Sequence, residues 1–295
     1  MNVSDERINL WAKPIGDTEE EKCQSAIRQI TDVMRERFGN SVKIIHQGSH
    51  ANRTNVRADS DVDIAVVYED SYFSDVEWLP ADHQTHYWNA LVPATYSFEQ
   101  FKKDTHDALV KKFGLLGVSR KNKCIRVAGN STRINADVVP AFRSNRYSAL
   151  GVVAHRGIGF ITDNDKKLTH SFPEQHYDSG VSKNEATSTA FKAAVRVLKN
   201  TRNEMTDKGI IVKDSMPSFF LESLVWNAGN HHFTSATYRE DARAVAAAVW
   251  NDMRVLATAQ NYKEVSELKW LLREAHRTPA QAELFMHRAW NYLEP

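Results

Sequence analysis

The fold is decided by residues 42–68, which read VKIIHQGSHANRTNVRADSDVDIAVVY. A β-branched run at each end of this stretch predicts a strand, and Gly48 and Ser49 directly follow the first one. The second predicted strand opens with two acidic residues, Asp61 and Asp63. Because successive side chains of a strand alternate between its faces, both carboxylates are expected to project on the same side. The sequence therefore places two like charges close together at the start of an apolar strand.

A third carboxylate is predicted on another strand. The runs 124–128 (CIRVA) and 132–142 (TRINADVVPAF) flank a Gly-Asn turn signal, which is typical of a β-hairpin, and Asp137 lies in the second run. Adjacent carboxylates repel one another, and a divalent cation between them relieves the repulsion. Hard oxygen ligands favour Mg²⁺, with Mn²⁺ as the alternative, over Zn²⁺. The three aspartates are therefore predicted to hold two metal ions, an arrangement used for in-line nucleotidyl transfer.

Gly48 and Ser49 are suited to the same chemistry. A glycine allows the backbone to approach a phosphate closely, and a serine hydroxyl beside exposed N–H groups can bind a triphosphate. Each motif alone also has a purely structural interpretation. A Gly-Ser pair is often a simple turn, and Asp61 and Asp63 could face solvent on an edge strand. The order and separation of the pieces favour a nucleotide site.

Composition excludes several classes of protein. The 295 residues include 38 basic and 37 acidic ones, so the net charge is +1 and the overall positive field of a nucleic-acid-binding protein is absent. No apolar stretch approaches the roughly 20 residues of a membrane span, and the first residues are polar and acidic, so we expect a cytoplasmic protein without a membrane partner. Cys23 and Cys124 form no CxxC pair and are expected to be free, buried thiols.

The hydrophobic periodicity predicts an α/β protein with two lobes. Residues 1–180 are expected to form a catalytic lobe with a mixed sheet and an N-terminal helix at 19–38, and residues 181–295 a helical lobe. The nucleotide cleft is expected between them. The helices expected in the second half span 185–205, 217–229, 236–259, 262–275 and 278–292.

One predicted helix carries a cationic stripe. Lys192, Arg196 and Lys199 are spaced i, i+4 and i+7, so they share one side of the helix at 185–205. Facing a cleft, this stripe would neutralise a triphosphate, and facing water it would be an ordinary solvated surface. With three aspartates nearby in the proposed site, the first reading is favoured for Lys199.

The motifs together resemble a known superfamily. The segment 46–68 is similar to the catalytic signature of nucleotidyltransferases with a polymerase-β-like palm. Three later segments resemble the bacterial cyclic-oligonucleotide synthases related to cyclic GMP-AMP synthase, the CD-NTase group of anti-phage (CBASS) signalling systems. These segments are SFPEQHYDSGVSKN (171–184), FKAAVRVLKNTRNEM (191–205) and PSFFLESLVWNA (217–228).

The resemblance implies roles for individual residues. Asp61, Asp63 and Asp137 match the family's metal carboxylates, and Asp137 matches the one that helps to deprotonate the attacking hydroxyl. The matches to nucleotide-binding positions are Gly48 and Ser49 on the triphosphate, Lys199 and Ser218 on phosphate oxygens, and Phe219 on a base, where tyrosine is frequent in the family.

The function expected is Mg²⁺-dependent condensation of nucleoside triphosphates into a cyclic di- or trinucleotide second messenger, with release of pyrophosphate. The substrates implied are ATP, with UTP, GTP or CTP as partners, and the product is expected to be read by a separate effector protein. We expect a monomer that requires no nucleic acid. Two alternatives remain open at this point: a nucleotidyltransferase that acts on an RNA end or a small-molecule hydroxyl, and a nucleotide sensor without turnover.

Overall fold

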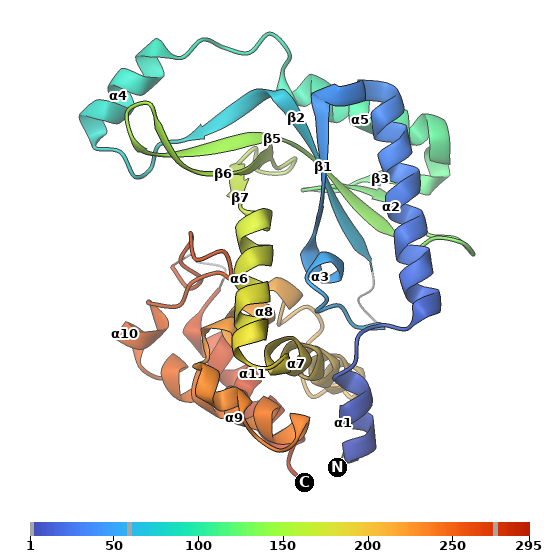
Figure 1. The fold of residues 1–295 in the computed structure, drawn as a ribbon, viewed down its shortest axis with the longest axis vertical. Coiled ribbons are helices and arrows are strands. Elements are labelled where there is room, and N and C mark those ends of the chain that lie inside the picture. Colours follow the sequence, from blue (N-terminus) through green and yellow to red (C-terminus); the bar gives the residue numbers. More distant parts are fainter. Residues whose placement is uncertain (1–2, 58–60, 274–276) are drawn as a thin grey trace. The chain divides into compact units, whose positions relative to one another are not determined.

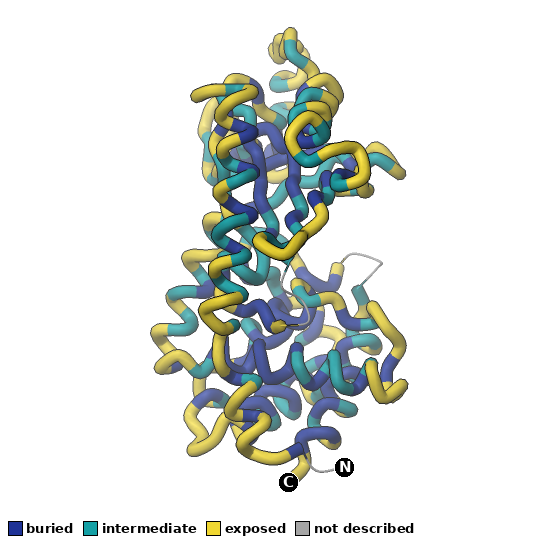
Figure 2. The backbone as a smooth tube through the Cα atoms, turned by 90° about the vertical axis from the view of Figure 1, so that its right-hand side faces the viewer, coloured by how far each residue is buried: buried dark blue, intermediate teal, exposed yellow. Residues whose placement is uncertain are grey.

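The computed structural model describes residues 3–57, 61–273 and 277–295. The chain divides into two compact units, and Figures 1 and 2 show the backbone of each. The sheet unit comprises residues 17–47 and 61–173, and the helical unit comprises residues 1–16, 48–60 and 174–295. The expected division at 180/181 therefore differs in three segments, since residues 1–16, 48–60 and 174–180 group with the C-terminal helices.

The sheet unit is built on seven strands among the described residues, in the order β1-β2-β5-β4-β3, with β6 paired to β5 and β7 to β6. Strands β2 and β5 are parallel, and every other pairing is antiparallel. The predicted hairpin is confirmed by the pairing of β4 with β5. The strands are β1 (Val42–Gln47), β2 (Val62–Asp75), β3 (Val118–Arg120), β4 (Ile125–Val127), β5 (Ala136–Ala149), β6 (Val152–Ile161) and β7 (Leu168–Ser171).

Helices cover one face of this sheet. Phe101 of α5 contacts the rings of Tyr68 on β2 and Phe142 on β5, so the even-numbered side chains of β5 up to Phe142, and of β2 up to the bulge after Tyr68, face the helices. The odd-numbered side chains Ala65 and Ala141 belong to a separate buried cluster on the opposite face. The helices of the sheet unit are α2 (Asp17–Phe38), which confirms the helix expected at 19–38, α4 (Ala81–Ala90) and α5 (Phe98–Phe113).

The helical unit packs its helices around one apolar core. The largest fully buried side chains there include Phe191 and Leu198 of α7 and Phe220 of α8. The dark blue parts of the tube in Figure 2 mark the buried segments of this unit. Its helices are α1 (Asp5–Trp11), α3 (Gly48–Ala51), α6 (Pro173–Ala186), α7 (Ala190–Asp207), α8 (Ser218–Asn227), α9 (Tyr238–Met253), α10 (Leu256–Ala259) and α11 (Pro279–Tyr292).

The structure differs from the sequence analysis in two segments. No strand was predicted for the stretch 151–171, which forms β6 and β7. Gly157 and Gly159 allow close approach here, since an added Cβ would clash with the Ser171 carbonyl and the Phe73 ring. The described part of the expected helix 262–275 is not helical: Leu271 N–H donates to the Tyr262 carbonyl at 2.8 Å, and a turn buries Val265 between them. Residues 274 and 275 of that prediction lie outside the described residues. Apolar spacing alone does not distinguish such a turn from a helix.

Two further observations concern membrane and redox chemistry. Among the helices of the described ranges, none has the length and apolar character needed to cross a lipid bilayer. Cys23 and Cys124 are free thiols, as predicted, and Cys23 is fully buried whereas Cys124 is partly exposed.

Candidate active site

The three predicted aspartates lie together at the beginning of β2 and β5. The parallel register of these strands pairs Asp63 with Asp137, and Asp61 immediately precedes β2. All three occupy odd-numbered positions, which belong to the sheet face opposite α2 and α5. The tertiary pairing of β2 with β5 therefore brings Asp137 beside a residue 74 positions earlier in the chain.

An arginine that the sequence analysis did not assign to the site binds two of these carboxylates. Arg126 of β4 pairs with Asp137 of β5 in register. Its Nη2 donates to Asp61 Oδ2 at 2.7 Å, and its Nη1 lies 3.5 Å from Asp137 Oδ1. Asn135 Nδ2 donates to the other oxygen of Asp61 at 3.0 Å. Both oxygens of the Asp61 carboxylate are therefore engaged by side chains of the sheet unit.

Burial and neighbouring charges shift the pKa values of the side chains around Asp137. Burial raises the pKa of the Asp137 carboxyl, the Arg126 charge opposes this increase, and the Asp61 charge adds to it. Burial, and next the Asp137 charge, raise the pKa of the Cys124 thiol to about 12. Cys124 is therefore a protonated thiol at neutral pH in the absence of a metal ion.

The donor set of the three aspartates suits a hard divalent cation. Carboxylate oxygens are the ligands that Mg²⁺ and Mn²⁺ prefer, and the guanidinium of Arg126 shows that Asp61 and Asp137 already share one cation. In the described ranges, no group of three or more His, Cys, Asp or Glu side chains is arranged to hold a metal ion. Arg126 bridges two of the three carboxylates, and their joint binding of metal ions stays a prediction.

Gly48 and Ser49 form the short helix α3 at the end of β1. Gly48 has a φ of 71°, in the left-handed region where a residue without Cβ is favoured. The carbonyl of Ser49 accepts from the N–H groups of Thr54 and Asn55, at 2.9 and 3.1 Å. The segment after β1 is therefore a compact turn held by its own backbone.

The cationic stripe of α7 is buried, so the alternative of a solvated surface is wrong. Lys199 is fully buried, and Lys192 and Arg196 are 9% and 7% exposed. Lys199 Nζ donates to the Thr54 carbonyl at 3.0 Å. Arg196 donates to the carbonyls of Ala12 and Arg53, at 2.8 and 2.6 Å. These bonds explain why residues 1–16 and 48–60 belong to the helical unit.

Lys199 is one member of a buried polar network that was not predicted. Glu222 of α8 accepts from Thr54 Oγ1 at 2.7 Å and lies 3.4 Å from Lys199 Nζ and 3.2 Å from His176 Nε2. Burial alone would raise the pKa of Glu222, but the Lys199 charge and the bonds from His176 and Thr54 lower it to about 2. Lys199 therefore positions the turn after Ser49 through the Thr54 carbonyl. Its expected contact with a triphosphate stays a prediction. The signal that could have found this network is the charge of Glu222 inside the apolar run FFLESLVW.

Ser218 and Phe219 begin α8 and are accessible. Ser218 Oγ accepts from Arg202 Nη1 at 2.8 Å. Ser218 and Arg202 line a cavity of about 470 Å³ in the helical unit. Phe219 is 38% exposed, and its ring lies 5.6 Å from the His176 ring and 5.1 Å from the Arg277 guanidinium. Arg202, which was not predicted, therefore adds a positive charge beside Ser218.

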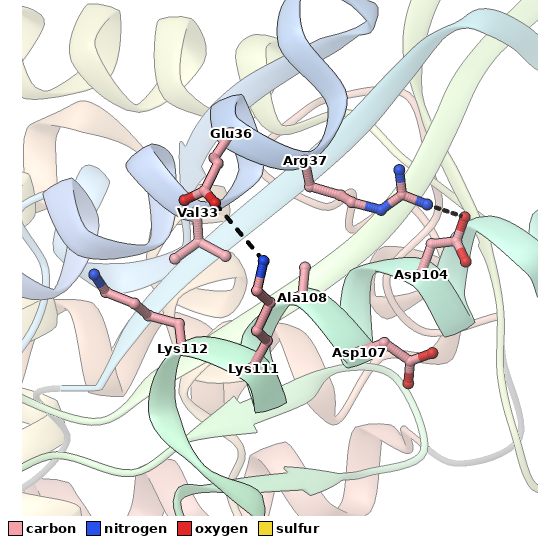
Figure 3. A pocket seen from close by; sticks show the side chains of 8 residues that line it. All are labelled: Val33, Glu36, Arg37, Asp104, Asp107, Ala108, Lys111 and Lys112. Carbon is pink, nitrogen blue, oxygen red and sulfur yellow. Dashed lines mark hydrogen bonds and ion pairs between the residues drawn. The ribbon is translucent and has the colours of Figure 1, made fainter.

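Two basic residues of α5 line a groove of mixed charge in the sheet unit. Lys111 and Lys112 line a groove of about 540 Å³ between α2 and α5, where Figure 3 shows Lys111 directed toward Glu36 and Arg37 paired with Asp104. The Lys111 and Glu36 atoms are 4.0 Å apart, and the Arg37–Asp104 distance is 2.8 Å. The mixed charge of this groove gives no reason to expect a polynucleotide there.

Comparison with known proteins establishes the family. Residues 178–294 match the cGAS/DncV-like nucleotidyltransferase C-terminal helical domain. The chain is 42% identical over 294 residues to a cyclic dipurine nucleotide synthase from Elizabethkingia meningoseptica, with 99% of each chain covered. The chain belongs to the cGAS/DncV-like nucleotidyltransferases. The family expected from the sequence motifs is therefore confirmed.

Two further matches support this membership. A cyclic dipyrimidine nucleotide synthase, CdnE, from Cecembia lonarensis is 35% identical over 296 residues, with 99% of this chain and 98% of the relative covered. A solved structure of the E. meningoseptica CdnE cyclic dinucleotide synthase with GTP and Apcpp superimposes with a TM-score of 0.83 at 41% identity, covering 100% of both chains. The predicted α/β class, with a polymerase-β-like sheet and C-terminal helices, is thereby confirmed.

Proposed function

We propose that this nucleotidyltransferase joins two nucleoside triphosphates into a cyclic dinucleotide and releases pyrophosphate at each condensation. The observation that carries the proposal is the register of Asp63 with Asp137, next to Asp61, in a chain of this family. Relatives named for cyclic dipurine and cyclic dipyrimidine products support the reaction class. A cyclic trinucleotide remains within the same chemistry, since ring size depends on how many condensations precede closure.

Asp61, Asp63 and Asp137 would hold divalent cations, with two Mg²⁺ ions proposed and Mn²⁺ as the alternative. When bound, such ions activate the attacking hydroxyl and neutralise the charge of the leaving pyrophosphate. Asp137 supplies a carboxylate oxygen that accepts the proton of the attacking hydroxyl. The remaining catalysis comes from positioning the two substrates, because no covalent enzyme intermediate is needed.

The helical unit supplies the proposed nucleotide contacts. The backbone and hydroxyl of Gly48 and Ser49 are assigned to triphosphate oxygens, as is the hydroxyl of Ser218. Phe219 offers an exposed ring on which a base can stack, an interaction worth about 1–3 kcal/mol. Lys199 contributes indirectly, because it holds the Thr54 carbonyl and thereby the turn that contains Ser49.

The biological setting is proposed on the family alone. The cyclic dinucleotide would be read by a separate effector protein in an anti-phage (CBASS) response, and the synthase would act as a monomer without nucleic acid or membrane. The two free thiols are typical of a reducing compartment, which supports the cytoplasm.

The decisive experiment is mass spectrometry of the products that the purified protein forms from ATP, GTP, CTP and UTP with Mg²⁺ and no added acceptor. A cyclic dinucleotide is expected, and Asp63→Asn should lower its formation at least about 100-fold, the scale of losing one main electrostatic contributor. Asp70→Asn is the matched control, because Asp70 lies on the same strand but is exposed.

Other outcomes would overturn the proposal. Nucleotide transfer that requires an added RNA or small-molecule hydroxyl would replace it with the acceptor-dependent reaction. Nucleotide binding with no pyrophosphate release from any mixture would indicate a sensor. Wild-type turnover in Asp63→Asn would remove the carboxylates from the mechanism.

A further inference from the structure

Arg126 contacts two carboxylates of the cluster, although catalysis by metal ions does not require an arginine there. Its backbone is fixed opposite Asp137 by the pairing of β4 with β5. Its guanidinium reaches from there to Asp61 and Asp137 and is one-third exposed, with 33% of its side chain accessible. The sheet therefore fixes the backbone of Arg126, whereas its guanidinium can change position.

The contacts of Asp61 show what a metal ion would have to displace. One Asp61 oxygen accepts from Arg126 at 2.7 Å, and the other accepts from Asn135 at 3.0 Å. A distance of 2.7 Å is typical of a strong charge-assisted hydrogen bond. Magnesium binds its oxygen ligands at about 2.0–2.1 Å in a nearly ideal octahedron, so it needs lone pairs that point at the ion. The guanidinium and the ion therefore compete for the same oxygens.

The charges of the cluster also indicate that the guanidinium and a metal ion compete for Asp61 and Asp137. Asp61, Asp63 and Asp137 bring three negative charges to neighbouring positions of one sheet face, and Arg126 offsets one of them. A divalent ion at the same carboxylates would offset two, and it would repel the guanidinium at short range. The cluster therefore favours one cation or the other at Asp61 and Asp137.

We propose that Arg126 is an exchangeable internal cation, which bridges Asp61 and Asp137 while no divalent ion is bound and is displaced when the ion enters. This inference rests on the proposed metal site. Arg126 is then a positioning residue that lowers the affinity for the free metal ion and keeps the two carboxylates from separating in its absence. The displaced guanidinium becomes available to the anionic phosphates of a nucleotide.

The test is titration of the nucleotide-free, full-length protein with Mn²⁺, with free Mn²⁺ measured by electron paramagnetic resonance. Arg126→Gln should bind Mn²⁺ about tenfold more tightly than the wild type, within the range by which neighbours tune metal affinity. Arg126→Lys, which keeps the charge but not the two-pronged contact, should fall between them. A structural defect would weaken Mn²⁺ binding, so the sign of the change separates exchange from damage.

The matched control is Arg120→Gln. Arg120 lies on β3, its Nε and Nη2 donate to Asp163 at 2.7 and 2.9 Å, and its register partner Ile125 belongs to the helix-covered side of the sheet. This variant loses a two-pronged ion pair of similar exposure, 39% for the arginine, without touching the cluster. Its Mn²⁺ affinity should stay within about twofold of the wild type.

The outcomes distinguish the two proposals. Equal or weaker Mn²⁺ binding by Arg126→Gln, with binding lost in Asp63→Asn, would retain the metal site and overturn the exchange. Mn²⁺ binding that is unaffected in Asp63→Asn, or absent from every variant, would overturn the metal site and the exchange together.

Discussion

Replacing Lys199 with methionine should lower the free energy of unfolding by about 3–5 kcal/mol, the usual effect of removing one partner from a buried ion pair. Lys199 is fully buried and Glu222 is 4% exposed, so the remaining carboxylate would have no solvent to replace the ammonium. The structure gives an independent magnitude. Burial raises the pKa of Glu222, and its partners, with Lys199 as the main charge, together lower it from 4.5 to about 2, a net effect of about 3 kcal/mol for all of them.

The assay is urea unfolding at pH 7 followed by far-ultraviolet circular dichroism. Lys103→Met is the matched control, because Lys103 pairs with Asp107 at 2.7 Å but 63% of its side chain is exposed. An exposed pair contributes at most about 1 kcal/mol. The double variant Lys199→Met/Glu222→Gln should be less destabilised than the sum of its single changes, since the two side chains interact directly.

The same network predicts the acid response. Because folding lowers the pKa of Glu222 to about 2, its contribution to stability is complete above about pH 4.5 and is lost as the pH falls toward 2. In Lys199→Met the pKa of Glu222 should rise, so the loss should begin at a higher pH. The reasoning is refuted if Lys199→Met is no less stable than Lys103→Met, because the buried ammonium would then contribute nothing.

Three further predictions concern local features. In the capping box of α9, the Thr237 hydroxyl accepts from the Glu240 N–H, and the Glu240 carboxylate accepts from the Thr237 N–H. Thr237→Ala removes this box and should lower the free energy of unfolding in urea by about 1 kcal/mol. An unchanged unfolding midpoint would contradict this role. Gly48→Ala places a residue with a Cβ in the left-handed conformation and should lower the free energy of unfolding by about 1–2 kcal/mol, measured as a lower melting temperature. A melting temperature at or above that of the wild type would show that the turn relaxes freely. Burial raises the pKa of Cys23 to about 11 and that of Cys124 to about 12, so neither thiol should react promptly with a disulfide reagent at pH 8, and fast labelling of the folded protein would contradict these environments.

Much of the sheet unit could be predicted because its signals are local. The alternation of side chains placed Asp61 and Asp63 on one face, and the turn signal at residues 129–130 predicted the pairing of β4 with β5. Strands β6 and β7 were missed, because glycine and histidine weaken the period of two that marks a strand. The site was predicted in its acidic residues but not in Arg126, since nothing in a local pattern shows which carboxylate an arginine will reach.

The amino-acid sequence alone determined the class of chemistry, because carboxylates at fixed spacing on a strand, a Gly-Ser turn and a distant aspartate are properties of residue type and order. Only the tertiary structure decided which charges meet. It paired Asp63 with Asp137, connected Arg126 to Asp61 and Asp137, and buried Lys199 against Glu222. The physical reason is that the partner of a charge depends on distance through space, whereas periodicity along the chain reports only which side of an element a residue occupies.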